Sequence, residues 1–232
     1  MYQLYIANKN YSSWSLRPWL LLSALGIPFD EHLVPFVEGH AANWEAFRAF
    51  SPNGKVPCLH DSATVVWDSL AIAEYLAERH PDVWPSDPSA RAWARCAAAE
   101  MHSGFSALRQ HCGMNCGVRV RLRQDLPAAL AADIARIDEL WSEGLRRFGG
   151  PFLAGPGFTA VDAFFAPVAF RVQTYGIKLG DAAGDYVQRL LELPAMRRWY
   201  ADALQERWLD AGHEAEVLHS GELLHDLRVP VG

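Results

Sequence analysis

Short apolar segments alternate with polar turns through the first third of the chain. The apolar run at 3–7 is too short for a helix and predicts a first strand, and residues 29–34 are predicted to form a second one. Two further runs, 56–59 and 64–67, flank a polar turn and predict a hairpin. Apolar residues at helical spacing predict helices at 15–25, 43–50 and 70–79. Strand, helix, strand, helix, hairpin and helix in this order predict a small sheet flanked by helices.

Three prolines fall within residues 80–88, the clearest linker pattern in the chain. Beyond it strand patterns fade, and helical spacing predicts helices at 89–111, 127–148, 160–175 and 194–208. Pro167 lies inside the third of these and should kink or split it. The sequence therefore predicts an α/β domain over 1–79, a linker over 80–88 and an all-helical domain over 89–232.

Composition narrows the function classes. The chain has 232 residues, half of them apolar, and can bury a substantial core. A formal charge of −6 and a pI of about 5.8 give no electrostatic signature of a nucleic-acid-binding protein. Arg119, Arg121 and Arg123 alternate in one stretch, and we interpret them as a solvated helix face or turn.

No stretch approaches 18 uninterrupted apolar residues, and the first residues carry neither a basic start nor a long apolar segment. We therefore expect neither a membrane span nor a signal peptide. Four cysteines in a chain of this length fit a reducing cytosol better than a disulfide framework. These features predict a soluble cytoplasmic protein.

Residues 51–59 combine turn chemistry with the start of a strand. Gly54 is free to take a positive φ, and Pro57, which has no amide hydrogen, fits the first residue of a strand or an edge. A cis bond before Pro57 would leave the main chain of Val56 facing outward, where it can pair with an extended peptide ligand. The alternative is an ordinary loop followed by an edge strand.

Hydroxyl groups gather where the first predicted strand gives way to the first helix. Ser12, Ser13 and Ser15 lie beside the positive end of that helix, so one of them can donate a hydrogen bond to a thiolate or carboxylate. Asp68 and Ser69 repeat the pattern at a later helix start, where Ser69 can hold a carboxylate and Asp68 an amine. Helix capping alone is the simpler explanation for both groups.

Three motifs taken in order resemble the glutathione S-transferases, in particular the serine-type, zeta- or tau-like cytosolic branch. They are YSSWSLR (11–17), SPNGKVP (51–57) and DSLAI (68–72), and TAVD (159–162) is similar to the family's capping box at a helix start. Each motif is weak alone, but the ordered set spans nearly the whole chain. The resemblance implies a thioredoxin-like α/β N-terminal domain and an all-α C-terminal domain.

The resemblance also implies a function: a cytosolic homodimer that conjugates glutathione, its cosubstrate, to a small electrophilic and apolar molecule in detoxification, without a metal. By position, Ser12 stabilises the glutathione thiolate, with Ser13 and Ser15 as alternates. The other implied contacts are Val56, before a cis Pro57, to the cysteinyl backbone, Asp68 and Ser69 to the γ-glutamyl end, and Lys55 to a carboxylate.

The electrophile should bind between the domains, where small-molecule sites are common. Met101, His102, Phe105 and Leu108 on the first long helix are candidates to line this acceptor pocket, or they are plain core. His111, Cys112 and Cys116 invite a metal site, but three ligands without a fourth argue against one. Cys58 is expected to pack as a small apolar residue.

Three alternatives remain beside the transferase. A glutathione-dependent isomerase of the zeta type resembles Ser-Ser-Cys-Ser at the first motif, where this chain has Trp14 instead of cysteine. A thiol reductase of the omega type would need a cysteine near Ser12, and that region has none. A non-catalytic, transferase-like binding domain predicts a damaged glutathione site, whereas Ser12, Pro57 and Ser69 are all present.

Overall fold

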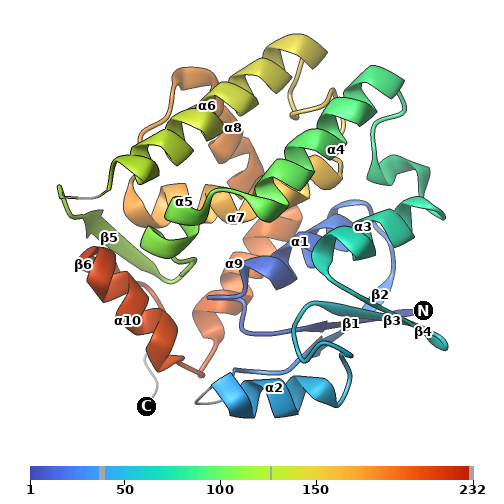
Figure 1. The fold of residues 1–232 in the computed structure, drawn as a ribbon, viewed down its shortest axis with the longest axis horizontal. Coiled ribbons are helices and arrows are strands. Elements are labelled where there is room, and N and C mark those ends of the chain that lie inside the picture. The colour runs from blue at the N-terminus through green and yellow to red at the C-terminus, as the bar shows by residue number, and fades with distance from the viewer. Residues whose placement is uncertain (37–39, 126, 230–232) are drawn as a thin grey trace.

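The computed structural model describes residues 1–36, 40–125 and 127–229. Its first part is a four-stranded sheet of order β2-β1-β3-β4 with three helices (Figure 1). The elements are β1 (Tyr2–Ile6), α1 (Ser13–Ala24), β2 (Phe29–Leu33), α2 (His40–Arg48), β3 (Cys58–Asp61), β4 (Thr64–Trp67) and α3 (Ser69–Ala77). This mixed sheet is the thioredoxin-like arrangement that the resemblance implies.

Strand β1 is the centre of the sheet. It pairs in parallel with β2, with Tyr2 opposite Phe29, and antiparallel with β3, with Leu4 opposite Leu59. Leu4 and Ile6 alternate along it and are both fully buried. Helices α1 and α3 cover one face of the sheet, and α2 lies on the other (Figure 1). The loop after β1 therefore leads directly into α1, which is where the candidate serines lie.

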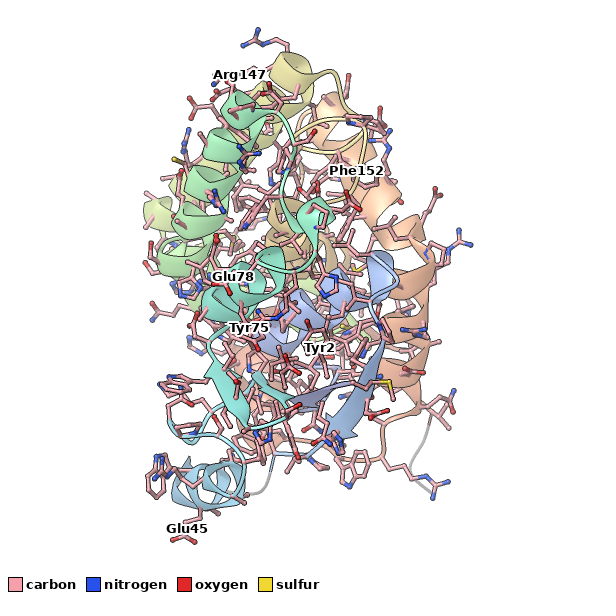
Figure 2. All side chains as sticks on the ribbon, turned by 90° about the vertical axis from the view of Figure 1, so that its right-hand side faces the viewer. Tyr2, Glu45, Tyr75, Glu78, Arg147 and Phe152 are labelled. Atoms are coloured by element: carbon pink, nitrogen blue, oxygen red, sulfur yellow. The ribbon has the colours of Figure 1, made fainter. Side chains whose placement is uncertain are left out.

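The second part is helical and packs around one buried helix. A short 3-10 segment, η1 (Pro81–Val83), precedes α4 (Pro88–Ser103), α5 (Ser106–His111), α6 (Ala128–Phe148), α7 (Ala160–Tyr175), α8 (Asp181–Glu192), α9 (Pro194–Gln205) and α10 (Ala211–Ser220). Helix α7 is buried along almost its whole length and contacts α1, α4 and α8. In Figure 2, Glu45 on α2 and Arg147 on α6 lie at opposite ends of the molecule.

The start of α7 confirms the capping box that the sequence suggested. The Thr159 N–H donates to Asp162 Oδ2 at 2.9 Å, and the helix begins at Ala160. Asp162 is fully buried, and its Oδ1 accepts from the Leu153 N–H at 3.0 Å and from the Tyr186 hydroxyl at 2.8 Å. This carboxylate therefore fastens the start of α7 to the preceding loop and to α8.

Several predictions about the helical part were wrong in detail. The helix expected over 89–111 breaks at Gly104 and Phe105, where Phe105 takes a left-handed φ of 57°. Pro167 does not split α7, which runs through it without interruption. Helices α8 and α10 were not predicted. Among the described residues, no helix has the length and apolar character needed to cross a bilayer.

Arg119 and Arg121 lie in a strand and not in a helix or turn, and Arg123 directly follows that strand. Residues 118–122 form β5 (Val118–Leu122), which pairs antiparallel with β6 (Gly221–Asp226). Val118 and Val120 point into the core, while Arg121 is exposed and forms an ion pair with Glu222 at 2.8 Å. An apolar–polar alternation of period two is the pattern of a half-buried strand. The helical domain therefore contains one small sheet as well.

Candidate functional site

A cavity of about 880 Å³ lies between the two parts of the molecule. One side comes from the loop after β1, from α2 and from the turn before β3, with Ser12, Trp44 and Val56 among its residues. The other side comes from the helical part, with Arg109, Arg171 and His213. This hollow is thus an interdomain one, the position in which small-molecule sites are common.

Ser12 is the N-terminal cap of α1 and forms part of the cavity wall. Its Oγ accepts from the Ser15 N–H at 3.4 Å and forms a 2.7 Å hydrogen bond with Ser15 Oγ. Ser13 also lines the cavity, whereas Ser15 is fully buried behind Ser12 and accepts from the Ala7 N–H at 3.2 Å. Of the three serines, Ser15 supports the wall and does not line it.

Tyr11 lines the cavity beside Ser12, but its hydroxyl is engaged elsewhere. It donates to Glu214 Oε1 at 2.7 Å and accepts from Arg228 Nη1 at 3.2 Å. Burial, followed by the hydrogen bond to Glu214, raises the pKa of Tyr11 well above its usual value. The phenol is therefore a neutral structural group, and Ser12 remains the hydroxyl at the helix terminus.

The turn that carries Val56 approaches the cavity from the side opposite the helical part. Gly54, Lys55 and Val56 line it, and the Val56–Pro57 bond is cis, as the resemblance implied. Gly54 has a φ of 62°, and a Cβ there would stand 2.6 Å from the Trp44 ring. Glycine is thus required at this turn for both its conformation and the close approach of α2.

Asp68 and Ser69 do not line this cavity. Asp68 caps α3 through Oδ1, which accepts from the Leu70 N–H at 2.8 Å, and its Oδ2 lies 3.4 Å from His102 Nε2. Ser69 is buried, and its Oγ accepts from Arg17 Nη1 at 3.4 Å. The structure therefore supports the capping role of Asp68, and Arg17 links this helix start to α1.

The four acceptor-pocket candidates are not among the lining residues either. Met101, Phe105 and Leu108 are buried in the core, and His102 packs edge-on against Trp14 with ring centroids 5.3 Å apart. The break at Gly104 and Phe105 redirects the chain, so that residues further along α5 and beyond it reach the cavity instead. These residues are Arg109, Gly113 and Met114.

Two guanidinium groups lie over the Trp14 ring, and a third, that of Arg171, is close enough to both to repel them. The Arg17 and Arg109 groups lie 4.2 and 4.8 Å from its ring centroid, and Arg17 and Arg171 are almost fully buried. Burial and then repulsion from Arg171 lower the pKa of Arg109 to about 10. Burial likewise lowers the pKa of Arg17, and Arg109 and Arg171 lower it further. Arg109 and Arg171 line the cavity and Arg17 does not, so the first two give the cavity a cationic side that the sequence did not indicate.

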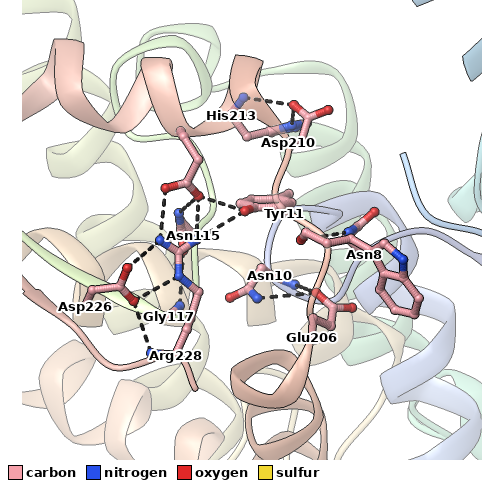
Figure 3. A network of polar contacts seen from close by, with 12 residues as sticks. Asn8, Asn10, Tyr11, Asn115, Gly117, Glu206, Asp210, His213, Asp226 and Arg228 are labelled. Atoms are coloured by element: carbon pink, nitrogen blue, oxygen red, sulfur yellow. Dashed lines mark hydrogen bonds and ion pairs between the residues drawn. The ribbon is translucent and has the colours of Figure 1, made fainter. Parts of the chain in front are cut away.

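Polar contacts from the end of the chain fix the loop that leads to Ser12 (Figure 3). Glu206 is buried and accepts from the Lys9 N–H at 2.5 Å and the Asn10 N–H at 3.0 Å. Arg228 forms an ion pair with Glu214 at 2.6 Å, and Glu214 in turn accepts from Tyr11. Two segments far apart in sequence thereby set the position of residues 9–11.

Replacing Glu206 with alanine should lower the free energy of unfolding by about 2–3 kcal/mol, because two buried backbone donors lose their acceptor. Urea denaturation of the wild type and the variant measures this. Glu206→Gln keeps an acceptor oxygen and should lose less. Glu192→Ala, on the exposed surface of α8, is the matched control. Equal losses in Glu206→Ala and Glu192→Ala would contradict the role assigned to this carboxylate.

The cysteines are free thiols, and burial raises the pKa of Cys58 to about 11 and that of Cys112 to about 12. Cys58 is fully buried, in the packing role expected for it. Metals bind the thiolate form, so a raised pKa disfavours ligation by Cys112. Within the described residues, no three histidine, cysteine or carboxylate side chains gather into a metal-binding group.

Comparisons with known proteins find similarity along most of the chain. Residues 11–79 match the family model for the glutathione S-transferase N-terminal domain, and residues 90–202 match that for its C-terminal domain. A probable maleylacetoacetate isomerase of Caenorhabditis elegans is 25% identical, over 90% of this chain and 97% of that protein. The glutathione S-transferase GstA of Escherichia coli O157:H7 is also 25% identical, over 84% and 94%.

Solved structures agree in fold. A glutathione transferase homologue from Burkholderia with bound glutathione has a TM-score of 0.65 at 21% identity, covering 87% of this chain and 97% of that one. A diazinon-metabolising glutathione S-transferase of the silkworm Bombyx mori reaches 0.68 at 17% identity, covering 88% and 97%. The two domain models match in chain order and together span most of the sequence, and the fold agrees with them. The chain belongs to the glutathione S-transferase family.

Proposed function

We propose that this protein conjugates the thiolate of glutathione to a small electrophile. The observation that carries the proposal is Ser12, whose hydroxyl caps α1 and lies on the wall of the interdomain cavity that Lys55 and Val56 also line. A helix N-terminus stabilises an anion, and a hydroxyl donor adds a directed hydrogen bond. Together they are suited to a bound thiolate.

The hydrogen-bond chain behind Ser12 explains how its hydroxyl becomes available. Ser12 Oγ donates to Ser15 Oγ at 2.7 Å, and Ser15 Oγ also accepts from the Ala7 N–H. When glutathione binds, the Ser12 hydrogen turns to the sulfur and the Ser15 hydroxyl donates to Ser12 in its place. Ser15 is therefore a positioning residue that leaves Ser12 without an unpaired oxygen.

The required stabilisation is modest. A free thiol with a pKa near 8.5 is only about 3% ionised at pH 7, and a drop of roughly two units makes the thiolate dominant. This corresponds to about 2.7 kcal/mol. One hydroxyl hydrogen bond to a charged sulfur and a helix terminus can supply that amount. The thiolate then attacks the electrophilic carbon, with orientation providing further acceleration.

The remaining glutathione contacts are assigned from the family motifs. The Val56 main chain pairs with the cysteinyl backbone, next to Pro57, and Lys55 binds a carboxylate. Asp68, whose side chain is 42% exposed, meets the γ-glutamyl amine, and Ser69 holds its carboxylate. The family further suggests a cytoplasmic homodimer.

Titration of the ultraviolet thiolate signal of bound glutathione tests the proposal. We expect a thiol pKa about two units below that of free glutathione in the wild type, and a return towards the free value in Ser12→Ala. Binding with an unchanged pKa in the wild type would favour a non-catalytic, glutathione-binding domain. Absence of glutathione binding would overturn the assignment.

A glutathione-dependent isomerase is the second candidate, because relatives at 25% and 27% identity are named as probable or established maleylacetoacetate isomerases. The two activities differ in stoichiometry. A transferase consumes one glutathione for each product, whereas an isomerase adds the thiolate, allows rotation and releases it again. Measuring free thiol against product formed during turnover of an electrophilic cis-alkene separates the two.

A further inference from the structure

The cationic side of the cavity lacks matching carboxylates. Among the residues that the structure describes, no carboxylate lies within 4.0 Å of the guanidinium nitrogens of Arg17, Arg109 or Arg171. Arg17 and Arg171 are only 1% and 3% exposed. An uncompensated buried charge is costly, so such groups are usually paired, and here the missing partner is an anion.

The polar contacts of these arginines are to neutral groups. Arg171 donates through Nε to the Cys112 carbonyl at 2.7 Å and through Nη1 to the Pro167 carbonyl at 3.3 Å. Arg109 donates to the Gly104 and Met101 carbonyls. Arg17 donates from Nη1 to Ser69, and its Nε and Nη2 are buried without a partner. Backbone oxygens therefore hold the Arg109 and Arg171 guanidinium groups in place, and a serine hydroxyl holds that of Arg17, without neutralising them.

The carboxylates nearest to the three arginines interact with them by charge alone, without a direct ion pair. Asp68 favours the charged form of Arg17, Asp133 that of Arg109, and Glu216 that of Arg171. Asp133 is already engaged, because its Oδ2 accepts from the Leu108 N–H at 2.9 Å. Glu216 lines the same cavity, so it reduces the positive potential beside Arg171. Asp210 also lines the cavity, but it is engaged by His213 at 2.7 Å, so the excess positive charge is local to Arg109 and Arg171.

Two of the three arginines are separated from the groups assigned to glutathione, whereas Arg17 belongs to the sheet domain and donates to Ser69 Oγ at 3.4 Å. Arg109 and Arg171 come from the helical part and line the cavity together with Gly113 and Met114. Lys55 and Val56, assigned to glutathione, come from the sheet domain. An electrophile that meets a thiolate at Ser12 must occupy the space towards the helical part. Its binding site is therefore the one that contains the arginines.

We propose that the acceptor is an anionic electrophile, whose carboxylate or equivalent oxyanion binds Arg109 and Arg171 while its reactive carbon faces the thiolate at Ser12. This inference rests on the proposed function and replaces the apolar acceptor expected from the family. A planar guanidinium binds a carboxylate through two parallel hydrogen bonds, so the pair orients the acceptor as well as binding it. Trp14 also lines the cavity, and the Arg17 and Arg109 guanidinium groups both lie over its ring.

A matched pair of aryl chlorides tests the proposal, 4-chloro-3,5-dinitrobenzoate and its neutral amide, 4-chloro-3,5-dinitrobenzamide. In each, the sulfur of glutathione forms a bond to the ring carbon, chloride leaves with its electron pair, and the thiol proton passes to solvent. Each kcat/KM is divided by the uncatalysed rate constant of the same compound, which removes the difference in intrinsic reactivity. We expect the benzoate to be favoured at least tenfold, which corresponds to about 1.4 kcal/mol.

Arginine variants test which side chain causes the preference for the benzoate over the amide. Arg109→Gln should lower kcat/KM for the benzoate more than for the amide, so that the tenfold preference falls to near unity, and Arg109→Lys should keep part of the preference. Arg95→Gln, which removes a surface ion pair with Glu74, is the control and should keep the full preference. Because Arg171 supports the chain at Cys112, its variants can fail to fold, so calorimetric binding of the two glutathione conjugates to the Arg109 variants is the second measurement.

These experiments distinguish failure of the anionic-acceptor proposal from failure of the proposed transferase function. If both acceptors are conjugated equally well, the enzyme is a transferase and the anionic subsite is wrong. If Arg109→Gln raises the KM for glutathione equally with both acceptors, the arginines serve glutathione and the inference is overturned. If neither acceptor reacts and glutathione does not bind, the proposed function fails first.

Discussion

Replacing Ser12 with alanine is expected to lower kcat/KM for conjugation on the order of 25-fold at pH 7. The figure follows from ionisation alone: a thiol with a pKa near 6.5 is roughly 75% thiolate at pH 7, and one near 8.5 is about 3%. The loss should shrink as pH rises, since the mutant's thiol ionises unaided above pH 8.5. A pH–rate profile should therefore show the apparent pKa moving upwards by about two units.

The same substitution removes the cap of α1, at a cost of about 1 kcal/mol in stability, so thermal unfolding must be measured beside the kinetics. Ser103→Ala, at an exposed position on α4, is the control for loss of a hydroxyl far from the cavity. If Ser13→Ala moves the pH profile and Ser12→Ala does not, the thiolate contact belongs to Ser13 and our assignment is wrong.

Replacing Asp162 with alanine should lower the free energy of unfolding by about 4 kcal/mol. The carboxylate is fully buried and accepts from the Leu153 and Thr159 N–H groups and from the Tyr186 hydroxyl. Truncation leaves three buried donors without an acceptor, at about 1–3 kcal/mol each before relaxation. Urea denaturation followed by tryptophan fluorescence measures the change in the unfolding midpoint.

Asp185→Ala is the matched control, because Asp185 is exposed on α8 and its loss should change stability by less than about 0.5 kcal/mol. Asp162→Asn is also informative: its amide nitrogen would face a donor and should recover only part of the loss. A stability of Asp162→Ala within 1 kcal/mol of wild type would show that water or a rearranged loop replaces the carboxylate.

Local signals explain what the sequence predicted well. A serine before an apolar run, a glycine in a turn and a proline at a strand start act within a few residues. For this reason the start of α1, the turn at Gly54 and the cap of α3 at Asp68 were foreseeable. The order of strands and helices followed from the same periodicities. The fold class was therefore predictable from residues close together in the chain.

Two missed elements had readable patterns. Helix α8 buries Ala183, Tyr186, Val187 and Leu190, which are spaced as one face of a helix. Strand β5 alternates valine and arginine with a period of two. In both cases the pattern was present in the sequence. The α8 segment was not assigned to any helix, and the arginines of β5 were interpreted as a solvated helix face or turn. A systematic comparison of both periods would have found α8 and β5.

The cationic side of the cavity had no such signal. Arg17, Arg109 and Arg171 are distant in sequence, and each lies in a helix where an arginine is ordinary. Their proximity depends on the left-handed Phe105 that turns α5, and on the packing of α7 against α1. The same break removed Met101 and Leu108 from the acceptor site. Side chains that meet only through tertiary packing cannot be paired from one sequence.

The wall formed by residues 209–216 has a consequence for biosynthesis. The ribosome delivers a chain from its N-terminus at about 5–20 residues per second, and domains fold in that order. A nascent chain that has emerged as far as Gln205 holds Ser12 and Val56, but it lacks Glu206, which fixes residues 9 and 10, and the cavity wall on α10. The complete cavity is therefore expected to form only after residues 206–216 have left the ribosome.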